Sequence, residues 1–283
     1  MDEKLISGKE LAALEKEKIR LEVEELKRKG VIPKLAVIIV GDNPASKSYV
    51  RGKHKDCKEC GIESLNIELP ETVTQEELLA EVNKLNDDPT VHGLLVQLPL
   101  PKHIDEFTVT NAISPLKDVD GFTSINVGNL SIGKDCFMPC TPQGCIDLIK
   151  YAGVDIKGKD VTVIGRSNIV GKPLALLLLR NDATVTVCHS KSKDIPSKTR
   201  ASDIVIVAVG RRGFLTGDML KEGAVVIDVG INRNAEGKLC GDADFESCYP
   251  IVSKITPVPG GVGLMTRVNL LKNTVKSAKN AVK

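Results

Sequence analysis

The segment of residues 160–190, DVTVIGRSNIVGKPLALLLLRNDATVTVCHS, constrains the fold most strongly. It begins with a short β-branched run that is typical of a strand buried on both faces of a parallel sheet. Gly165 ends this run, Gly171 closes the following turn, and Pro173 lies in the first turn of an apolar helix. Free backbone N–H groups and the helix dipole make such a turn an anion site. The segment predicts a dinucleotide-binding half-fold, with an ordinary strand–helix unit without ligand as the alternative.

The end of the second strand of this segment indicates which nucleotide binds. The turn lacks the usual G-x-G-x-x-G pattern, so the cofactor assignment needs a second feature. Folds that bind NAD place an Asp or Glu about 20 residues further on, against the ribose 2′-hydroxyl. Here the strand of residues 183–188 runs into His189, Ser190 and Lys191. A 2′-phosphate would meet a hydroxyl, a lysine and Arg166, so the sequence predicts NADP.

Composition excludes several classes of protein. The 283 residues suffice for two domains, and 42% hydrophobic with 27% charged residues is ordinary for a globular protein. A net charge of +2 with 3% aromatic residues gives no support to nucleic-acid binding. The charged N-terminal segment lacks a secretory apolar core, and no apolar run reaches membrane-spanning length. We expect a cytoplasmic protein that binds neither nucleic acid nor membrane.

The eight cysteines raise the question of a metal site. Cys57 and Cys60 form a C-x-x-C, but a zinc site needs a second closely spaced pair of ligands, and the four histidines are scattered. Reduced thiols of a cytosolic protein are the simpler interpretation. We therefore predict no metal.

The first half of the chain alternates between strand and helix. Apolar periodicity and glycine or cap signals predict helices at 7–29, 46–60 and 74–86 and strands at 34–40, 62–69 and 91–97. Such alternation predicts a parallel sheet with right-handed crossovers. With the dinucleotide segment and two further buried strands at 203–209 and 224–229, the fold class is α/β: two α/β domains, the second Rossmann-like, with an interdomain cleft.

The domain boundary is predicted between Gly121 and Thr141, a range that begins in the loop PLKDVDGF of residues 115–122. We assign residues 1–121 to the first domain and 122–263 to the nucleotide domain, and we expect 126–133 to be irregular. A final helix in 264–283 is expected to return to the first domain, because its apolar stripe must be buried.

Five polar residues of the first domain are candidates for chemistry. Tyr49 and Lys53 lie four apart on one helix, so they share a face. Burial there would lower the lysine pKa enough for proton transfer. The alternative is a solvated lysine beside other surface cations. Gln97 ends a buried strand, an unusual place for an amide, and Asp118 and Asp120 lie in a loop expected to border the same cleft.

Several motifs together resemble one family. They are SYVRGKHKDC, GLLVQLPLP, PLKDVDGF, PCTPQG, GRSNIVGKP, VIDVGIN, GDADF and TPVPGGVGLMT. In this order and spacing they are similar to the motif series of the bifunctional methylenetetrahydrofolate dehydrogenase/methenyltetrahydrofolate cyclohydrolases, over nearly the whole chain. One departure is Ala243 in GDADF, where the family more often has a larger apolar residue.

The resemblance implies a reaction and a substrate. The family oxidises 5,10-methylenetetrahydrofolate with NADP to the methenyl form and hydrolyses it to 10-formyltetrahydrofolate. It also implies a homodimer formed through the nucleotide domain. A monofunctional NAD-dependent dehydrogenase and a non-enzymatic nucleotide-binding scaffold are the alternatives.

The resemblance also implies roles for individual residues. Lys53 matches the catalytic lysine, Gln97 the amide that holds it, and Tyr49 the aromatic that stacks on the aminobenzoate ring. Asp120 matches the carboxylate that binds the pterin, whose adjacent N–H donors suit two parallel hydrogen bonds. The remaining matches are folate contacts at Val96, Leu98, Pro259, Gly260, Gly261, Val262 and Gly263, and cofactor contacts at Gly165, Arg166, Ser167, Ser190 and Ile231.

Overall fold

The computed structural model describes residues 2–281, apart from the side chain of Ala45, and these residues form two compact units. Unit 1 contains the residues up to Ala13 and Thr141–Thr266, and unit 2 contains Leu14–Cys140 and the residues from Arg267 onward. Both units are α/β, which confirms the predicted fold class. The predicted boundary at residue 121 stays a prediction.

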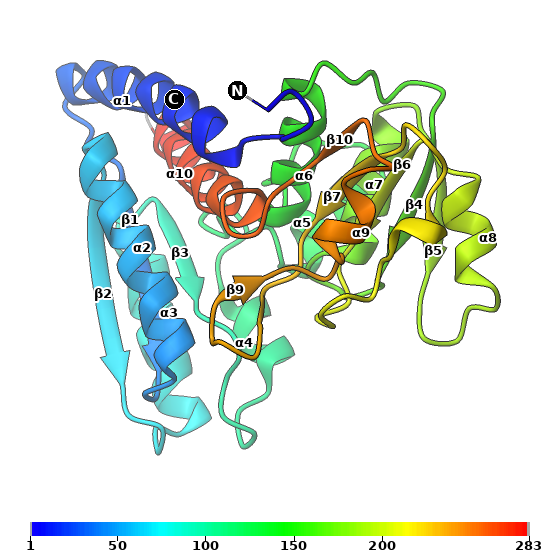
Figure 1. Cartoon of the computed structure of the whole chain (residues 1–283). Coiled ribbons are helices and arrows are strands. Elements are labelled where there is room, and N and C mark those ends of the chain that lie inside the picture. The colour runs from blue at the N-terminus through cyan, green and yellow to red at the C-terminus, as the bar shows by residue number, and fades with distance from the viewer. Residues whose placement is uncertain (1, 282–283) are drawn as a thin grey trace. The chain divides into compact units, whose positions relative to one another are not determined.

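Unit 2 is built on a three-stranded parallel sheet in the order β2-β1-β3 (Figure 1). The strands are β1 (Lys34–Val40), β2 (Glu63–Leu69) and β3 (Gly93–Val96). The sequence KLAVIIV makes β1 a central strand, because its apolar side chains are buried on both faces of the sheet. The edge strand β2 has a mostly polar, partly exposed face instead.

Unit 2 also contains helices. They are α2 (Pro44–Cys60), α3 (Gln75–Asp87), α4 (Glu106–Ala112) and α5 (Ser124–Ser131), with parts of α1 (Gly8–Arg28) and α10 (Val262–Ala281). Thr74 and Glu77 form the predicted capping box of α3. Residues of α10 pair with α1 through Lys272–Glu15 at 2.5 Å and Lys279–Glu22 at 2.9 Å.

One predicted irregular segment is a helix. Residues 126–133 overlap α5, so this prediction was wrong. Thr123 caps the helix by accepting a hydrogen bond from the backbone N–H of Asn126 at 3.4 Å. The helix is short and lacks a clear apolar stripe, which is why periodicity did not reveal it.

Unit 1 contains a five-stranded parallel sheet in the order β10-β7-β6-β4-β5 (Figure 1). The strands are β4 (Asp160–Ile164), β5 (Thr184–Cys188), β6 (Ile204–Val207), β7 (Val225–Asp228) and β10 (Lys254–Ile255). A separate antiparallel pair joins β8 (Asn232–Arg233) to β9 (Leu239–Cys240). These two-residue strands and β10 are too short to show periodicity in a sequence.

The helices of unit 1 are α6 (Cys140–Tyr151), α7 (Gly171–Arg180), α8 (Ile195–Arg200) and α9 (Phe245–Cys248), of which α6 begins at the unit boundary. A short 3₁₀ turn, η1, spans Gly217–Met219. Between residues 2 and 281, no helix has the length and apolar character that crossing a bilayer requires.

Candidate active site

Lys53 is the centre of a polar cluster in unit 2. It projects from α2, its residue is only 4% exposed, and its Nζ donates a hydrogen bond to Oε1 of Gln97 at 3.0 Å. The same Nζ lies 5.0 Å from the ring centroid of Tyr49, one helical turn earlier. The structure therefore brings together Tyr49, Lys53 and Gln97 and rejects the alternative of a solvated surface lysine.

The electrostatics of the cluster depend on burial and on one carboxylate. Burial lowers the pKa of Lys53, because the charged ammonium loses water, while the negative charge of Asp120 opposes this shift. Burial also raises the pKa of Asp120, and Lys53 opposes that shift in turn. A lysine with a lowered pKa holds a larger fraction of neutral amine near neutral pH than a surface lysine does.

Gln97 is fixed in orientation by the chain around it. Its backbone N–H donates to the carbonyl of Ile38 at 2.8 Å, which extends the β1–β3 pairing by one residue. Its Nε2 donates to the carbonyl of Leu98 at 2.8 Å, which leaves Oε1 to accept from Lys53. The two flanking residues with predicted folate contacts, Val96 and Leu98, are buried and half-buried.

Asp118 and Asp120 have different surroundings although they lie two residues apart. The carboxylate of Asp118 accepts hydrogen bonds from the backbone N–H groups of Gly121, Phe122 and Thr123 at 2.8–3.2 Å and from Nδ2 of Asn126 at 2.8 Å. These bonds hold the loop in place. Asp120 is outside this network, and its half-buried carboxylate interacts electrostatically with the charge of Lys53.

The same loop is held from α10, which sequence reasoning missed. Nδ2 of Asn273 donates to the carbonyls of Val119 at 2.8 Å and Met138 at 2.9 Å. Cys140 is also buried there, and its thiol donates to the Val119 carbonyl at 3.3 Å. The available sequence signal was a set of polar residues on the buried face of the last helix, namely Asn269, Asn273, Thr274 and Ser277.

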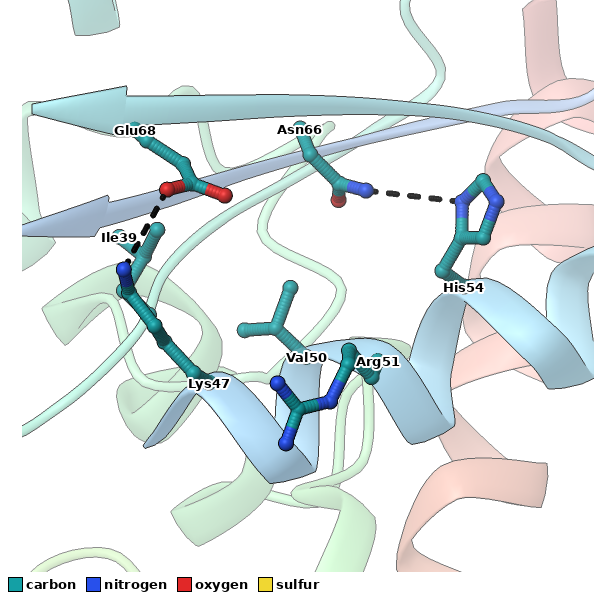
Figure 2. Close-up of a pocket in the computed structure, with 7 residues that line it drawn as sticks. All are labelled: Ile39, Lys47, Val50, Arg51, His54, Asn66 and Glu68. Atoms are coloured by element: carbon teal, nitrogen blue, oxygen red, sulfur yellow. Dashed lines mark hydrogen bonds and ion pairs between the residues drawn. The ribbon is translucent and has the colours of Figure 1, made fainter. Parts of the chain in front are cut away.

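The opposite side of α2 faces a different pocket, of about 530 Å³, shown in Figure 2. Lys47, Arg51 and His54 reach it from α2, while Asn66 and Glu68 reach it from β2. Lys47 pairs with Asp42 and, at 3.6 Å, with Glu68, and Asn66 contacts His54 at 3.5 Å. Two of the cations near Lys53 in the sequence, Lys47 and Arg51, therefore line a pocket that does not include Lys53.

In unit 1, the turn between β4 and α7 has the form of a phosphate site. Gly165 has a positive φ of 131°, and a side chain there would overlap the carbonyl of Ala208. A side chain at Gly171 would overlap the carbonyl of Gly165, so the helix begins tightly against the strand. Arg166 and Ser167 are exposed in this turn, and Oγ of Ser167 accepts from the backbone N–H of Gly171 at 3.3 Å.

The ends of β4 and β5 are adjacent, because the N–H of Gly165 donates to the carbonyl of Cys188 at 2.8 Å. Ser190 and Lys191 are exposed just beyond β5. The first carboxylate after them, Asp194, caps α8 by accepting from the N–H of Ser197 at 3.2 Å. The residues present therefore fit a cofactor with a 2′-phosphate, since a hydroxyl and cations follow β5 where NAD-binding folds have a carboxylate.

The other predicted residues of unit 1 lie at separate places. Ile231 is 64% exposed and follows β7. In the PGGVG segment, Pro259, Gly260 and Gly261 lie between β10 and α10, and Val262 and Gly263 are the first two residues of that helix. Within the described residues, no group of three or more His, Cys, Asp or Glu side chains is arranged to hold a metal ion.

Comparisons with known proteins agree with this geometry. Residues 6–120 match the model of the tetrahydrofolate dehydrogenase/cyclohydrolase catalytic domain, and residues 139–282 match that of the corresponding NAD(P)-binding domain. The chain is 55% identical to the bifunctional protein FolD of Bacillus cytotoxicus over 277 residues, which cover 98% of this chain and 97% of that protein. The FolD protein of Bacillus anthracis is 56% identical with the same coverage.

Solved structures give the same result. The bifunctional enzyme FolD from Campylobacter jejuni has a TM-score of 0.96 and 55% identity, with 98% of each chain covered. The Trypanosoma brucei enzyme, solved with NADP cofactor and inhibitor, has a TM-score of 0.94 and 42% identity, covering 99% of this chain and 98% of that one. The chain belongs to the tetrahydrofolate dehydrogenase/cyclohydrolase family.

Proposed function

We propose that this chain oxidises 5,10-methylenetetrahydrofolate with NADP to 5,10-methenyltetrahydrofolate and hydrolyses this product to 10-formyltetrahydrofolate. The observation that carries the proposal is the environment of Lys53. Its Nζ is buried, bonded to Gln97 at 3.0 Å and placed over Tyr49, with the charge of Asp120 nearby. Such a buried amine is suited to proton transfer, which both the burial and the family membership support.

Lys53 acts in the hydrolytic step. Water adds to the cationic methenyl carbon and loses one proton. The remaining hydroxyl proton passes to the ring nitrogen as the bond from that nitrogen to the carbon breaks, which leaves the formyl group on the other nitrogen. The neutral amine of Lys53 accepts or orients the proton of the attacking water, and burial favours that neutral form. Oε1 of Gln97 keeps the amine in position, because its own amide group is anchored to Leu98.

The folate is held by the residues around the lysine. The ring of Tyr49 offers a flat face for the aminobenzoate group. Asp120 accepts two hydrogen bonds from the pterin edge, and its availability is supported by the fact that Asp118 takes up the backbone donors of the loop. Val96 and Leu98 give apolar contact, and we assign the PGGVG segment of residues 259–263 as a further folate contact.

The cofactor is held by unit 1. Gly165, Arg166, Ser167 and Ser190 would bind the phosphates and the ribose, and Ile231 would contact the nicotinamide side. When bound, NADP supplies the hydride acceptor. Because oxidation requires the nicotinamide and the one-carbon bridge to meet, the reaction also needs the interdomain cleft, which stays a prediction.

Two variants of α2 test the role of Lys53. Lys53→Met should reduce methenyl hydrolysis by at least about 100-fold, which is the lower range for loss of a general base. The control is Lys55→Met, on the same helix but with a largely exposed side chain, which should retain the parent rate. Methenyl absorbance follows the hydrolysis and NADPH absorbance follows the oxidation. Hydrolysis at the parent rate by Lys53→Met would refute the assignment.

We also propose a homodimer formed through unit 1 and a cytoplasmic location. β5 is an edge strand with a partly exposed Val187, and Leu179 of the adjacent α7 is exposed. The eight cysteines are free thiols, which suits a reducing compartment. Light scattering of the parent and of Val187→Lys tests the dimer: a parent that elutes as a monomer would contradict it.

A further inference from the structure

Unit 1 contains two buried carboxylates that the reaction chemistry does not use. Asp228 is the last residue of β7, and Asp242 follows β9 and has no exposed surface. Buried carboxylates are costly to keep unless their oxygens accept hydrogen bonds. The partners of these two residues therefore indicate what they are for.

Asp242 connects the end of β6 with the β8–β9 pair. Its Oδ2 accepts from the backbone N–H groups of Val209 at 2.6 Å and Gly210 at 2.9 Å. Its Oδ1 accepts from Nδ2 of Asn232 at 2.8 Å, and the same Nδ2 donates to the carbonyl of Gly241 at 3.0 Å. The Asp242 carboxylate thus holds residues 209–210 and Asn232 next to the segment that follows β9.

Asp228 fixes the other side of the same loops. Its Oδ1 accepts from the N–H groups of Gly230 and Asp242, and its Oδ2 accepts from the N–H of Ala243, all at 2.9 Å. Side chains at Gly230 and Gly241 would overlap the carboxylates of Asp242 and Asp228, respectively. The glycines of VIDVGIN and GDADF therefore make room for the two acids.

Ile231 lies between two residues of this network. Gly230 is bonded to Asp228, and Asn232 is bonded to Asp242, whereas the side chain of Ile231 is largely exposed. We propose that Asp228 and Asp242 are positioning residues that hold Ile231 and the turn at 209–210 against the nicotinamide half of NADP. This inference rests on the proposed function and extends it to two residues that act through the chain segments they hold.

The dehydrogenase and hydrolase activities can be measured separately. A variant that only loses structure would lower both, whereas a variant that only misplaces the cofactor contacts would affect the dehydrogenase alone. Asp242→Asn should raise the KM for NADP at least about tenfold, since a charged acceptor for two backbone donors is lost. Methenyl hydrolysis needs no nucleotide and should stay within about twofold of the parent. Asp244→Asn, an exposed acid two residues on, is the control and should change neither activity.

A milder variant keeps the test informative if Asp242→Asn does not fold. Asn232→Ala removes only the amide donor to Asp242 and should raise the KM for NADP about threefold with hydrolysis unchanged. A folded Asp242→Asn with the parent KM for NADP would overturn the inference, as would an Asn232→Ala with unchanged KM if the first variant is unfolded. A parent that hydrolyses methenyltetrahydrofolate but does not reduce NADP would instead refute the proposed dehydrogenase activity. This outcome is measured on the parent protein alone, so it is distinct from an effect of the variants.

Discussion

Each unit of this chain contains a pair of acidic residues that the fold places close to a proposed site, and the two pairs have different partners. In unit 2, backbone donors occupy Asp118, while Asp120 is left to interact with Lys53. In unit 1, backbone and amide donors occupy both Asp228 and Asp242. The difference separates two roles of a buried carboxylate: one shapes a loop, and the other is available to a ligand.

The largest expected effect is on stability, at Asp118. Asp118→Ala leaves three backbone N–H groups and the Asn126 amide without their acceptor, so the free energy of unfolding should fall by about 4 kcal/mol. Urea unfolding measures this. Asp87→Ala, at an exposed position of unit 2, should change it by less than about 0.5 kcal/mol. Equal effects of the two variants would mean that Asp118 does not hold the loop.

The next effect concerns the pH dependence of unit 1. Burial raises the pKa of Asp228 to about 6, although three backbone N–H groups oppose the shift. Asp242 adds to the rise, and Arg212, Asp244 and Glu246 line the same pocket.

Because the folded pKa lies above the unfolded value, the contribution of Asp228 to stability is full below pH 4 and is lost as pH rises through 6. It amounts to about 3 kcal/mol. Asp228→Asn cannot titrate, so the parent should lose about that much relative to the variant between pH 4 and pH 7. Unfolding curves at several pH values measure the difference, and a constant difference would contradict the assigned shift.

A smaller effect is expected from Asp120. Asp120→Asn should lower kcat/KM for the folate substrate about 100-fold, since a charge-assisted pair of hydrogen bonds is lost, while the free energy of unfolding stays within about 1 kcal/mol. The two variants should therefore differ: Asp120→Asn should lose activity, whereas Asp118→Ala should lose stability. An Asp120→Asn protein with the kinetics of the parent would refute the assignment of Asp120 as a substrate contact.

The smallest effect concerns the nucleotide. Arg166→Ala should weaken NADP binding about tenfold, weaken NAD binding less, and leave methenyl hydrolysis unchanged, because we propose that its exposed guanidinium binds the 2′-phosphate, which NAD lacks. Steady-state kinetics with both nucleotides measure this. A parent that prefers NAD would overturn the cofactor argument from the sequence.

The sequence predicted the α/β class and the long elements, because β-branched runs and glycine-terminated helices are local signals. It also predicted NADP, because no Asp or Glu directly follows the strand β5. It could not decide whether Lys53 is buried, since the helix periodicity is the same for a solvated lysine. Burial depends on Gln97 and the Asp120 loop, which are distant in sequence.

The acid pairs show the same limit. Asp118 and Asp120 lie two residues apart in the same loop, and nothing in the sequence distinguishes their roles. Only the folded loop shows that Asp118 accepts the backbone hydrogen bonds. Asp242 belongs to the GDADF motif, but the sequence did not indicate its role, because its partners lie near residues 209 and 232. The role of Asn273 depends likewise on contacts with residues more than 130 positions away.

The ionisation of Lys53 tests the central claim most directly. Lysine side chains labelled with ¹³C at Cε can be titrated by NMR, and the resonance absent from Lys53→Met identifies this residue. We expect it to titrate at lower pH than the surface lysines, because burial lowers its pKa, and lower still in Asp120→Asn, where the opposing charge is gone. A Lys53 resonance that titrates together with the surface lysines would contradict the account.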